Sequence, residues 1–336
     1  MKAIIKKTVS ILCIAVFFNS CSKLNPQFEL GSLQKILDGY AVRAIAFDSK
    51  GNAWIVTQGQ EIIKYNDRGT VVYNSKNSEL PKDLYVWNIA VDKKDNVWIG
   101  ASDGVWKYDG NKFTLYNSQN TAMPEDIVWH IAVDSKNNIW MASCRFRQGG
   151  LVKYDGIKWT AYTPDNSALP VNSIKGIAID KSDNVWLALS ETVTQSYLVK
   201  ISNDKWDVYG EKDFGFTPYY LAGIQCDSKN RVWVNISYVL SSTIDPSRPT
   251  LFIFDGKKAD ILSSCSFISF IDHNDNAWGL GCRDGKTGWG VWIDEQWKQF
   301  NSFKPGESGG LVIKEDPYHR IWFGTEDGIY ISEKIH

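Results

Sequence analysis

Aromatic and cationic side chains recur at one position of a repeated sequence pattern, where they could bind a sugar and its carboxylate. That position, five residues before a repeated Asp, is occupied by Arg43, Trp87, Trp129, Lys175, Ala222, Phe267 and Leu311. Aromatic rings present flat apolar surfaces, and cations bind carboxylates. His130 follows Trp129 and adds a titratable group. These positions are candidates for ligand binding, and packing of the two Trp between neighbouring elements is the alternative.

Four polar stretches between predicted strands supply further candidates. The stretches are 144–150, 190–196, 237–250 and 282–290, and we interpret them as long loops. Their candidate ligand-binding residues are Arg145, Arg147, Arg248, Arg283 and Trp289, accompanied by Lys286 and by the acidic Glu191, Asp245 and Asp284. This mixture favours a glycan ligand, including one that carries carboxylates.

Patterns associated with catalysis or metals are weak in this chain. Segment 306–310 has the form Gly-x-Ser-x-Gly, but it lies between two predicted strands, whereas a nucleophile elbow joins a strand to a helix. The four His, at positions 130, 273, 319 and 336, are far apart in the sequence and lack metal-ligand spacing. The repeated Asp lacks the distal Glu of a calcium loop. The sequence therefore predicts no catalytic residue, no metal and no cofactor.

The composition excludes several classes of protein. With 43% hydrophobic and 22% charged residues, the chain can bury a large core and is too polar for a multispanning membrane protein. Its 37 basic and 38 acidic residues give a net charge of −1, which argues against nucleic acid as a partner. The 15 Trp, 15 Tyr, 15 Phe and 26 Gly favour short aromatic strands and tight turns over a helix bundle.

The N-terminus resembles a bacterial lipoprotein signal. Three Lys precede an apolar run at 9–18, and Ser20 then precedes Cys21. We predict a signal peptide at 1–20, acylation of Cys21 and a tether at 21–27, so that acyl chains anchor a monomer to the outer membrane. The periplasmic face is favoured because segment 22–25 has no acidic residue. The alternative is an ordinary secretory signal that is cleaved nearby.

Of the six Cys, four remain after Cys13 and Cys21 are assigned to the signal and the lipid: Cys144, Cys226, Cys265 and Cys282. Buried free thiols are expected, and a bridge between Cys265 and Cys282 is the alternative in an oxidising compartment.

A seven-fold repeat organises the rest of the chain. An Asp is followed six residues later by a Trp at intervals of 42 to 47 residues, in the pairs Asp48/Trp54, Asp92/Trp98, Asp134/Trp140, Asp180/Trp186, Asp227/Trp233, Asp272/Trp278 and Asp316/Trp322. Each pair marks a strand, a polar turn of Asx type and a second strand, and two further strands follow. Four strands in about 45 residues are typical of one propeller blade. We therefore interpret these Asp and Trp as structural residues of the repeat.

The last repeat has only three strands before the chain ends. The strand-like segment 28–37 precedes the first complete repeat and has no partner there. We therefore predict an all-β, seven-bladed β-propeller of four-stranded blades over residues 28–336, with the N-terminal strand as the outer strand of the last blade. In such a ring the four polar stretches emerge on one face, opposite the Asp-to-Trp turns.

The repeats are similar to the two-component regulator propeller repeat. Residues 96–109 read Asn-Val-Trp-Ile-Gly-Ala-Ser-Asp-Gly-Val-Trp-Lys-Tyr-Asp, and the linker 117–124 ends in Met-Pro, as 77–81 and 166–170 end in Leu-Pro. The resemblance covers almost everything after Phe28, although Arg231 departs from the pattern and blades five and six lack the linker. It implies a propeller and, through the extracytoplasmic sensors of hybrid histidine kinases, a glycan ligand.

Three functions remain open at this point. We favour a non-catalytic binding or sensing lipoprotein that recognises an extracellular glycan or an envelope protein. The first alternative is a lyase or hydrolase at the central mouth, because streptogramin lyases have a similar repeat; such a lyase is expected to pair His and Glu with a divalent metal. The second is a scaffold that contacts only other envelope proteins.

Overall fold

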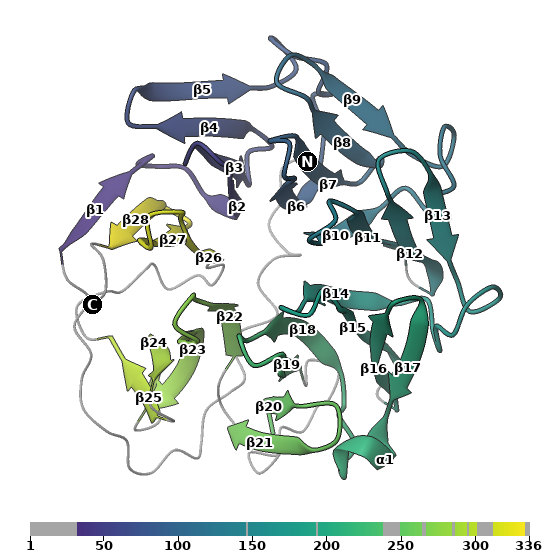
Figure 1. Cartoon of the computed structure of the whole chain (residues 1–336). Coiled ribbons are helices and arrows are strands. Elements are labelled where there is room, and N and C mark those ends of the chain that lie inside the picture. The colour runs from purple at the N-terminus through teal and green to yellow at the C-terminus, as the bar shows by residue number, and fades with distance from the viewer. Residues whose placement is uncertain are drawn as a thin grey trace, which may run out of the picture.

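Seven four-stranded antiparallel sheets form a ring, which defines a seven-bladed β-propeller (Figure 1). The computed structural model describes residues 32–145, 147–192, 194–237, 249–263, 267–283, 286–293, 296–300 and 312–332, with the backbone alone at 263, 281–283, 286 and 287. The predicted fold class is confirmed. Among the described residues, no helix is long and apolar enough to span a membrane.

The first four blades run in chain order from the innermost to the outermost strand. Blade one contains β2 (Val42–Phe47), β3 (Ala53–Thr57), β4 (Ile62–Asn66) and β5 (Gly69–Tyr73). Blade two contains β6 (Val86–Val91), β7 (Val97–Ala101), β8 (Val105–Tyr108) and β9 (Phe113–Tyr116). Blade three contains β10 (Val128–Val133), β11 (Ile139–Arg145), β12 (Gln148–Tyr154) and β13 (Trp159–Tyr162). Blade four contains β14 (Ile174–Ile179), β15 (Val185–Thr192), β16 (Gln195–Ser202) and β17 (Lys205–Tyr209).

The other three blades complete the ring. Blade five contains β18 (Leu221–Cys226), β19 (Val232–Ile236), β20 (Leu251–Phe254) and β21 (Ala259–Ser263). Blade six contains β22 (Phe267–Ile271), β23 (Ala277–Arg283), β24 (Lys286–Ile293) and β25 (Gln296–Gln299). Blade seven contains β26 (Val312–Glu315), β27 (Ile321–Thr325), β28 (Gly328–Ser332) and, as its outer strand, β1 (Leu33–Ile36).

The N-terminal strand closes the ring as predicted. β1 pairs antiparallel with β28, from Leu33 opposite Ser332 to Ile36 opposite Ile329. The strand is shorter than the predicted 28–37, of which 28–31 lie outside the described residues. By pairing the outer edge of blade seven, β1 ties the first strand of the described chain to its last.

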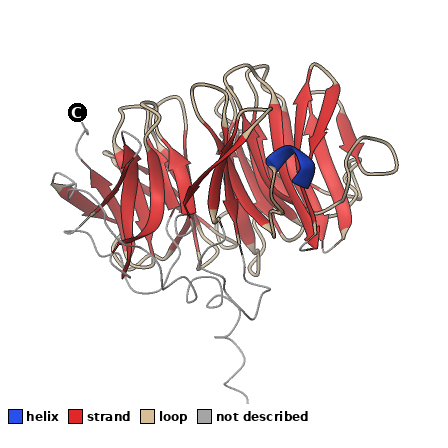
Figure 2. Cartoon of the chain, turned by 90° about the horizontal axis from the view of Figure 1, so that it is seen from below, coloured by secondary structure: helices blue, strands red, loops and turns tan. Residues whose placement is uncertain are grey.

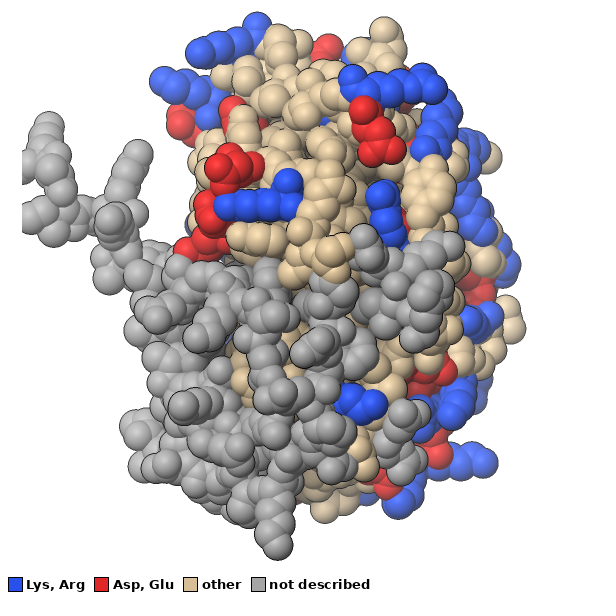
Figure 3. Space-filling model, turned by 90° about the vertical axis from the view of Figure 1, so that its left-hand side faces the viewer, with Lys and Arg blue, Asp and Glu red and all other residues tan. Residues whose placement is uncertain are grey.

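The strands run between the two faces of the ring, and α1 (Glu211–Phe214) lies on the outer wall (Figure 2). We call the face at which the innermost strands begin the entry face, and the face of the Asp-to-Trp turns the turn face. On the outer side shown in Figure 3, acidic and basic groups are interspersed, in keeping with a net charge near zero.

The Trp of each repeat fills the space between its own blade and the next. Trp54, Trp98 and Trp140 share apolar clusters with Ile89, Ile131 and Ile177, which lie on the innermost strands of blades two, three and four. The other four Trp pack in the same way: Trp186 with Ile224 of blade five, Trp233 with Ile268 of blade six, Trp278 with Ile313 of blade seven, and Trp322 with Ile45 of blade one. The ring is therefore held by seven equivalent aromatic contacts.

Three of the four predicted long loops are extensions of strands. β11 and β12 continue to Arg145 opposite Gln148, β15 and β16 to Thr192 opposite Gln195, and β23 and β24 to Arg283 opposite Lys286. In each extended hairpin, the backbone N–H and C=O groups of the polar stretch form hydrogen bonds with one another. In a long irregular loop, the same groups would have to form hydrogen bonds with water. In the fourth stretch, 238–248 lie outside the described residues.

Candidate functional site

The seven Trp of the repeat are buried and cannot line a ligand-binding surface. Each is at most 5% exposed: Trp54, Trp98, Trp140, Trp186, Trp233, Trp278 and Trp322. Each also donates from Nε1 to the carboxylate of the Asp six residues earlier; Trp140, Trp186 and Trp322 do so at 2.9 Å and Trp233 at 3.0 Å. With the ring packed between blades and its N–H already bonded, none of these Trp can stack on a ligand. Aromatic ligand contacts must come from other positions.

Seven predicted site residues lie five positions before the repeated Asp. Five of them are the bulged residue of a β-bulge at the start of the innermost strand. The pairing between the first two strands skips one residue in each of blades one to five, and the skipped residues are Arg43, Trp87, Trp129, Lys175 and Ala222. A bulged residue leaves the regular alternation of the strand, so its side chain is aimed differently from its neighbours. In blade six the shift falls between Ile268 and Phe270 instead, and Leu311 lies outside the described residues.

Four side chains from blades one to three form a continuous stack at the entry face, which we call the aromatic platform: Arg43, Tyr85, Trp87 and Trp129. The ring centroids of Trp87 and Trp129 are 4.0 Å apart, and those of Tyr85 and Trp87 are 4.5 Å apart. The guanidinium carbon of Arg43 lies 4.5 Å from the Tyr85 ring and 5.4 Å from the Trp87 ring. Tyr85 and Trp129 are each 37% exposed, so the platform offers aromatic surface to solvent.

Hydrogen bonds orient the platform. Arg43 donates from Nη2 to the Tyr85 hydroxyl at 3.0 Å and from Nη1 to the Val86 carbonyl at 3.3 Å. Trp129 Nε1 donates to the Cys144 carbonyl at 2.6 Å, which joins the platform to the β11–β12 hairpin. Trp87 Nε1 is buried and has no acceptor among the described residues. Tyr85 was not among the predicted site residues; it lies two residues before Trp87, between the predicted linker 77–81 and β6.

The remaining predicted ring residues do not belong to this stack. Lys175 Nζ lies 5.0 Å above the ring of Tyr220, in a separate cation–π pair. Phe267, at the start of β22, is 40% exposed. Ala222 offers no functional group. The entry face therefore has one aromatic platform on blades one to three and isolated groups elsewhere in its described part.

The predicted cationic residues of the hairpins are dispersed. Arg145 is exposed at the end of β11, and Arg147 Nε lies 3.5 Å from Glu191 Oε1 of blade four. Arg248 lies outside the described residues, and the side chain of Arg283 is likewise outside them. Trp289 packs against the core cluster between blades six and seven, with Trp278 and Phe323.

His130 lies on β10, the innermost strand of blade three. Burial and, to a smaller extent, the positive charge of Lys314 on β26 together lower its pKa from 6.5 to about 4. Burial also lowers the pKa of Lys314. His130 is therefore neutral at physiological pH, and in the part of the chain that the structure describes, Lys314 is the charged group that acts on it.

Cys144 and Cys226, the two Cys whose side chains the structure describes, are free thiols. Cys144 is buried, and burial raises the pKa of both Cys144 and Cys226. Raised thiol pKa values keep these groups protonated and unreactive. Cys265 and the side chain of Cys282 lie outside the described residues, as does segment 306–310.

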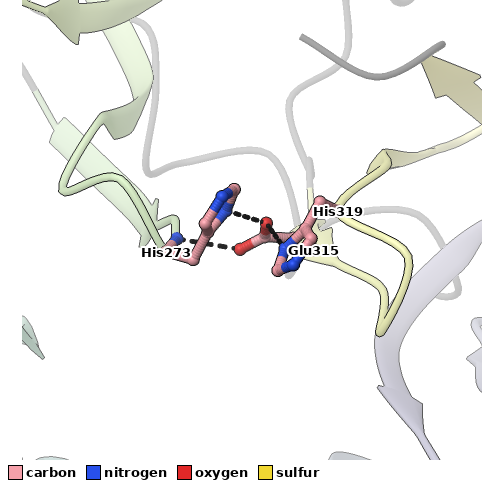
Figure 4. A group of neighbouring side chains, drawn as sticks. All are labelled: His273, Glu315 and His319. Carbon is pink, nitrogen blue, oxygen red and sulfur yellow. Dashed lines mark hydrogen bonds and ion pairs between the residues drawn. The ribbon is translucent and has the colours of Figure 1, made fainter. Parts of the chain in front are cut away.

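At the turn face the structure brings together two His that are 46 residues apart in the sequence. His273 and His319 flank the carboxylate of Glu315, and all three side chains contribute to one cluster between blades six and seven (Figure 4). The separation of these His along the chain hid the cluster from the sequence analysis. Its signal in the sequence is a departure from the repeat, because Glu315 occupies a position that is apolar or Cys in the other six blades.

The comparisons with known proteins address the fold. No family model and no curated protein matches the chain. The extracellular domain of the hybrid two component system BT3049 from B. thetaiotaomicron aligns with 90% of this chain and 41% of its own, at 18% identity and a TM-score of 0.65. The chain thus spans about two fifths of the length of that protein.

Two other solved structures of different function share the fold. A catalytically inactive variant of virginiamycin B lyase from Staphylococcus aureus, with quinupristin, aligns over 90% of this chain and 99% of its own, with 14% identity and a TM-score of 0.64. YCF48 bound to D1 peptide aligns over 94% and 98%, with 11% identity and a TM-score of 0.66. The chain is therefore a seven-bladed propeller whose fold is shared by extracellular domains of two component systems, as the repeats indicated. The fold alone does not select among these functions.

Proposed function

We propose that this chain is an extracytoplasmic lipoprotein whose propeller binds a glycan without catalysis, at the aromatic platform. The observation that carries the proposal is the stack of Trp87 on Trp129, with Arg43 at its other end, on the entry face. The fold is compatible with this role, because extracellular domains of two component systems have it as well.

The exposed indole suits a sugar ring. Trp129 is 37% exposed, yet Trp87 and the bond from Nε1 to the Cys144 carbonyl fix its orientation. A sugar that stacks on a ring already held in place loses little side-chain entropy on binding. The rigid stack thus supports binding of the apolar face of a pyranose.

The cation suits an acidic group. A guanidinium has five N–H donors, and among the described residues Arg43 uses Nη2 and Nη1 for one bond each, to Tyr85 and Val86. Donors remain for a carboxylate at the edge of the platform, where a charge-assisted bond would be formed. We therefore infer that the preferred glycan carries a uronic or sialic-type carboxylate.

The cellular setting of the proposal rests on the N-terminal segment. Acylation of Cys21 would place the propeller on the outer membrane, facing the periplasm, with segment 22–27 as the tether. These residues lie outside the described part of the chain, so the sequence pattern alone supports this step.

A glycan array followed by calorimetry tests the proposal. The variants are Trp129→Ala, Trp87→Ala and Arg43→Ala, and Tyr318→Ala is the matched control, because Tyr318 is an exposed aromatic (54%) at the turn face. Loss of one stacked aromatic is expected to weaken binding by about 1–2 kcal/mol, roughly ten-fold. Arg43→Ala should weaken acidic glycans more than neutral ones. Wild-type affinity in all three folded variants would refute the assignment of the site.

A partner protein is the second candidate for the same surface. Tyr, Trp and Arg are enriched at protein interfaces, and all three are present in the platform. An array without any glycan signal, together with an envelope protein that binds the wild type but not Trp129→Ala, would support this function instead. Turnover of a substrate that is abolished by His130→Ala would support the lyase or hydrolase.

A further inference from the structure

The turns of neighbouring blades are joined by a recurring hydrogen-bonded contact at the turn face, which we call the interface clasp. Ser49 of blade one donates from its backbone N and Oγ to the carboxylate of Asp95 in blade two, at 2.8 and 2.7 Å. Ser135 contacts Asp183 in the same way at 2.6 and 2.7 Å. Related clasps join the pairs Lys93/Asn137, Ser182/Asn230 and Ser228/Asp275.

The clasp between blades six and seven has different chemistry. His273 occupies the position of Ser49, and its backbone N donates to Glu315 Oε2 at 2.9 Å. His319 occupies the position of Asp95 and has φ 65°, a conformation that in the other six blades is adopted by Gly, Asp or Asn. Glu315 occupies a position that elsewhere holds Phe47, Val91, Val133, Ile179, Cys226 and Ile271. Three departures from the repeat thus meet at one interface.

The three side chains present nitrogen and oxygen donors to one point. Nδ1 of His273 and Nδ1 of His319 both contact Glu315 Oε1, the latter at 2.8 Å. The two imidazole rings lie with centroids 3.8 Å apart, and one potential ligand atom from each residue lies within 4.8 Å of the others. The side chains of His273 and His319 are 42% and 51% exposed, whereas that of Glu315 is 10% exposed.

We propose that His273, Glu315 and His319 bind a zinc ion. Two imidazoles and one carboxylate form a ligand set that Zn²⁺ adopts when three protein ligands leave the fourth position to water or to a donor from another molecule. Ca²⁺ and Mg²⁺ prefer oxygen ligands throughout, so they fit the cluster poorly. The exposure of both His places the fourth position on the solvent side.

Little rearrangement is needed for the ion to enter. Zinc bonds of about 2.0–2.1 Å in a tetrahedral arrangement separate neighbouring ligand atoms by about 3.3 Å. The distance of 2.8 Å from His319 Nδ1 to Glu315 Oε1 would have to open by roughly half an ångström, and the shorter contact of His273 Nδ1 with the same oxygen would have to open further. Because both His lie in turns at the surface, rotation of their side chains can provide this change while the strands stay in place. The bond from the backbone N of His273 to the other carboxylate oxygen would keep Glu315 oriented.

Calorimetry with ZnCl₂ on the metal-free full chain, purified without a His tag, tests the site at neutral pH. We expect one ion per chain, and a rise in melting temperature with Zn²⁺ but not with Mg²⁺ or Ca²⁺. His273→Gln, Glu315→Gln and His319→Gln should each lower the affinity by at least about 100-fold, more than the typical loss of an outer-shell partner. The matched control is Ser49→Ala, which removes a clasp side chain at another interface and no ligand.

Further measurements keep the test decisive. Circular dichroism and melting of each metal-free variant show whether it is folded, and Co²⁺ in place of Zn²⁺ should give the visible bands of a tetrahedral site in the wild type only. Absence of Zn²⁺ binding by the folded wild type would overturn the proposal, as would wild-type affinity in the folded His273→Gln and His319→Gln variants. Because the cluster lies at the turn face, either result leaves glycan binding at the entry face untouched.

Discussion

Trp98 Nε1 donates a hydrogen bond to the carboxylate of Asp92, six residues earlier in the chain, at 3.0 Å. The same bond closes the first hairpin of all seven blades at 2.9–3.2 Å. Asp92 also accepts bonds from the backbone N of Lys94 and Asn96 and from Asn96 Nδ2. One buried carboxylate therefore accepts hydrogen bonds both from the N–H groups of the turn and from the Trp that packs between blades.

Loss of this carboxylate should destabilise the domain. Asp92→Ala leaves the buried Trp98 Nε1 and the turn N–H groups without their acceptor, and we expect a loss of about 2–4 kcal/mol in the free energy of unfolding. Urea unfolding gives the value. Asp109→Ala is the control, because the exposed Asp109 carboxylate accepts turn bonds from Asn111 and Lys112, and its removal should destabilise the domain much less than Asp92→Ala. Equal losses in both variants would contradict this account of the Asp.

Removal of the closing strand should lower the melting temperature. Deletion up to residue 37 removes β1, exposes the edge of β28 and takes Ile36 out of the apolar cluster between blades seven and one. We expect a clearly lower melting temperature and self-association through the open edge, measured by calorimetry and light scattering. A deletion that ends at residue 31 is the control. If both deletions melt like the longer chain, closure by β1 contributes nothing to stability.

The stability should depend on the protonation of His130. Its pKa is about 4 in the folded chain, mainly because of burial, and 6.5 is the ordinary value expected after unfolding. The unfolded chain thus binds more protons between pH 4 and 6.5, so stability rises with pH across this window and is lost as pH falls through it. The full shift corresponds to at most about 3–4 kcal/mol of unfolding free energy.

Urea unfolding of the wild type and His130→Asn across this window checks the prediction. The variant cannot titrate at this position, so the difference in unfolding free energy between the two proteins should change with pH in favour of the wild type as pH rises. A constant difference would show that His130 titrates normally in the folded chain.

The predicted lipid anchor can be tested in cells. In the wild type, we expect Cys21 to be acylated, processing to be sensitive to globomycin, and the protein to partition into detergent with the membrane fraction. Cys21→Ser should abolish all three. A Cys21→Ser protein that still partitions with membranes would contradict acylation at this position.

The sequence by itself determined the fold, because the cause of each blade is local. The Asp and its Trp are six residues apart, so their bond forms within one hairpin, and seven repeats of it specify seven blades. The missing strand of blade seven likewise predicted closure by the N-terminus. Even the departure at Arg231 is explained locally, since its Nε donates to Asp227 at 2.7 Å in place of the usual Asn amide.

The candidate sites were decided by the tertiary structure, because their members belong to different blades. Position within the repeat identified Arg43, Trp87 and Trp129, but only the bulges and the ring determined that they stack together with Tyr85. His273 and His319 meet because the turns of adjacent blades lie side by side, a relation that the separation along the chain conceals. A hydrogen bond between residues that are close in the chain can be predicted from their spacing. Contacts between blades depend on which turns the closed ring places side by side.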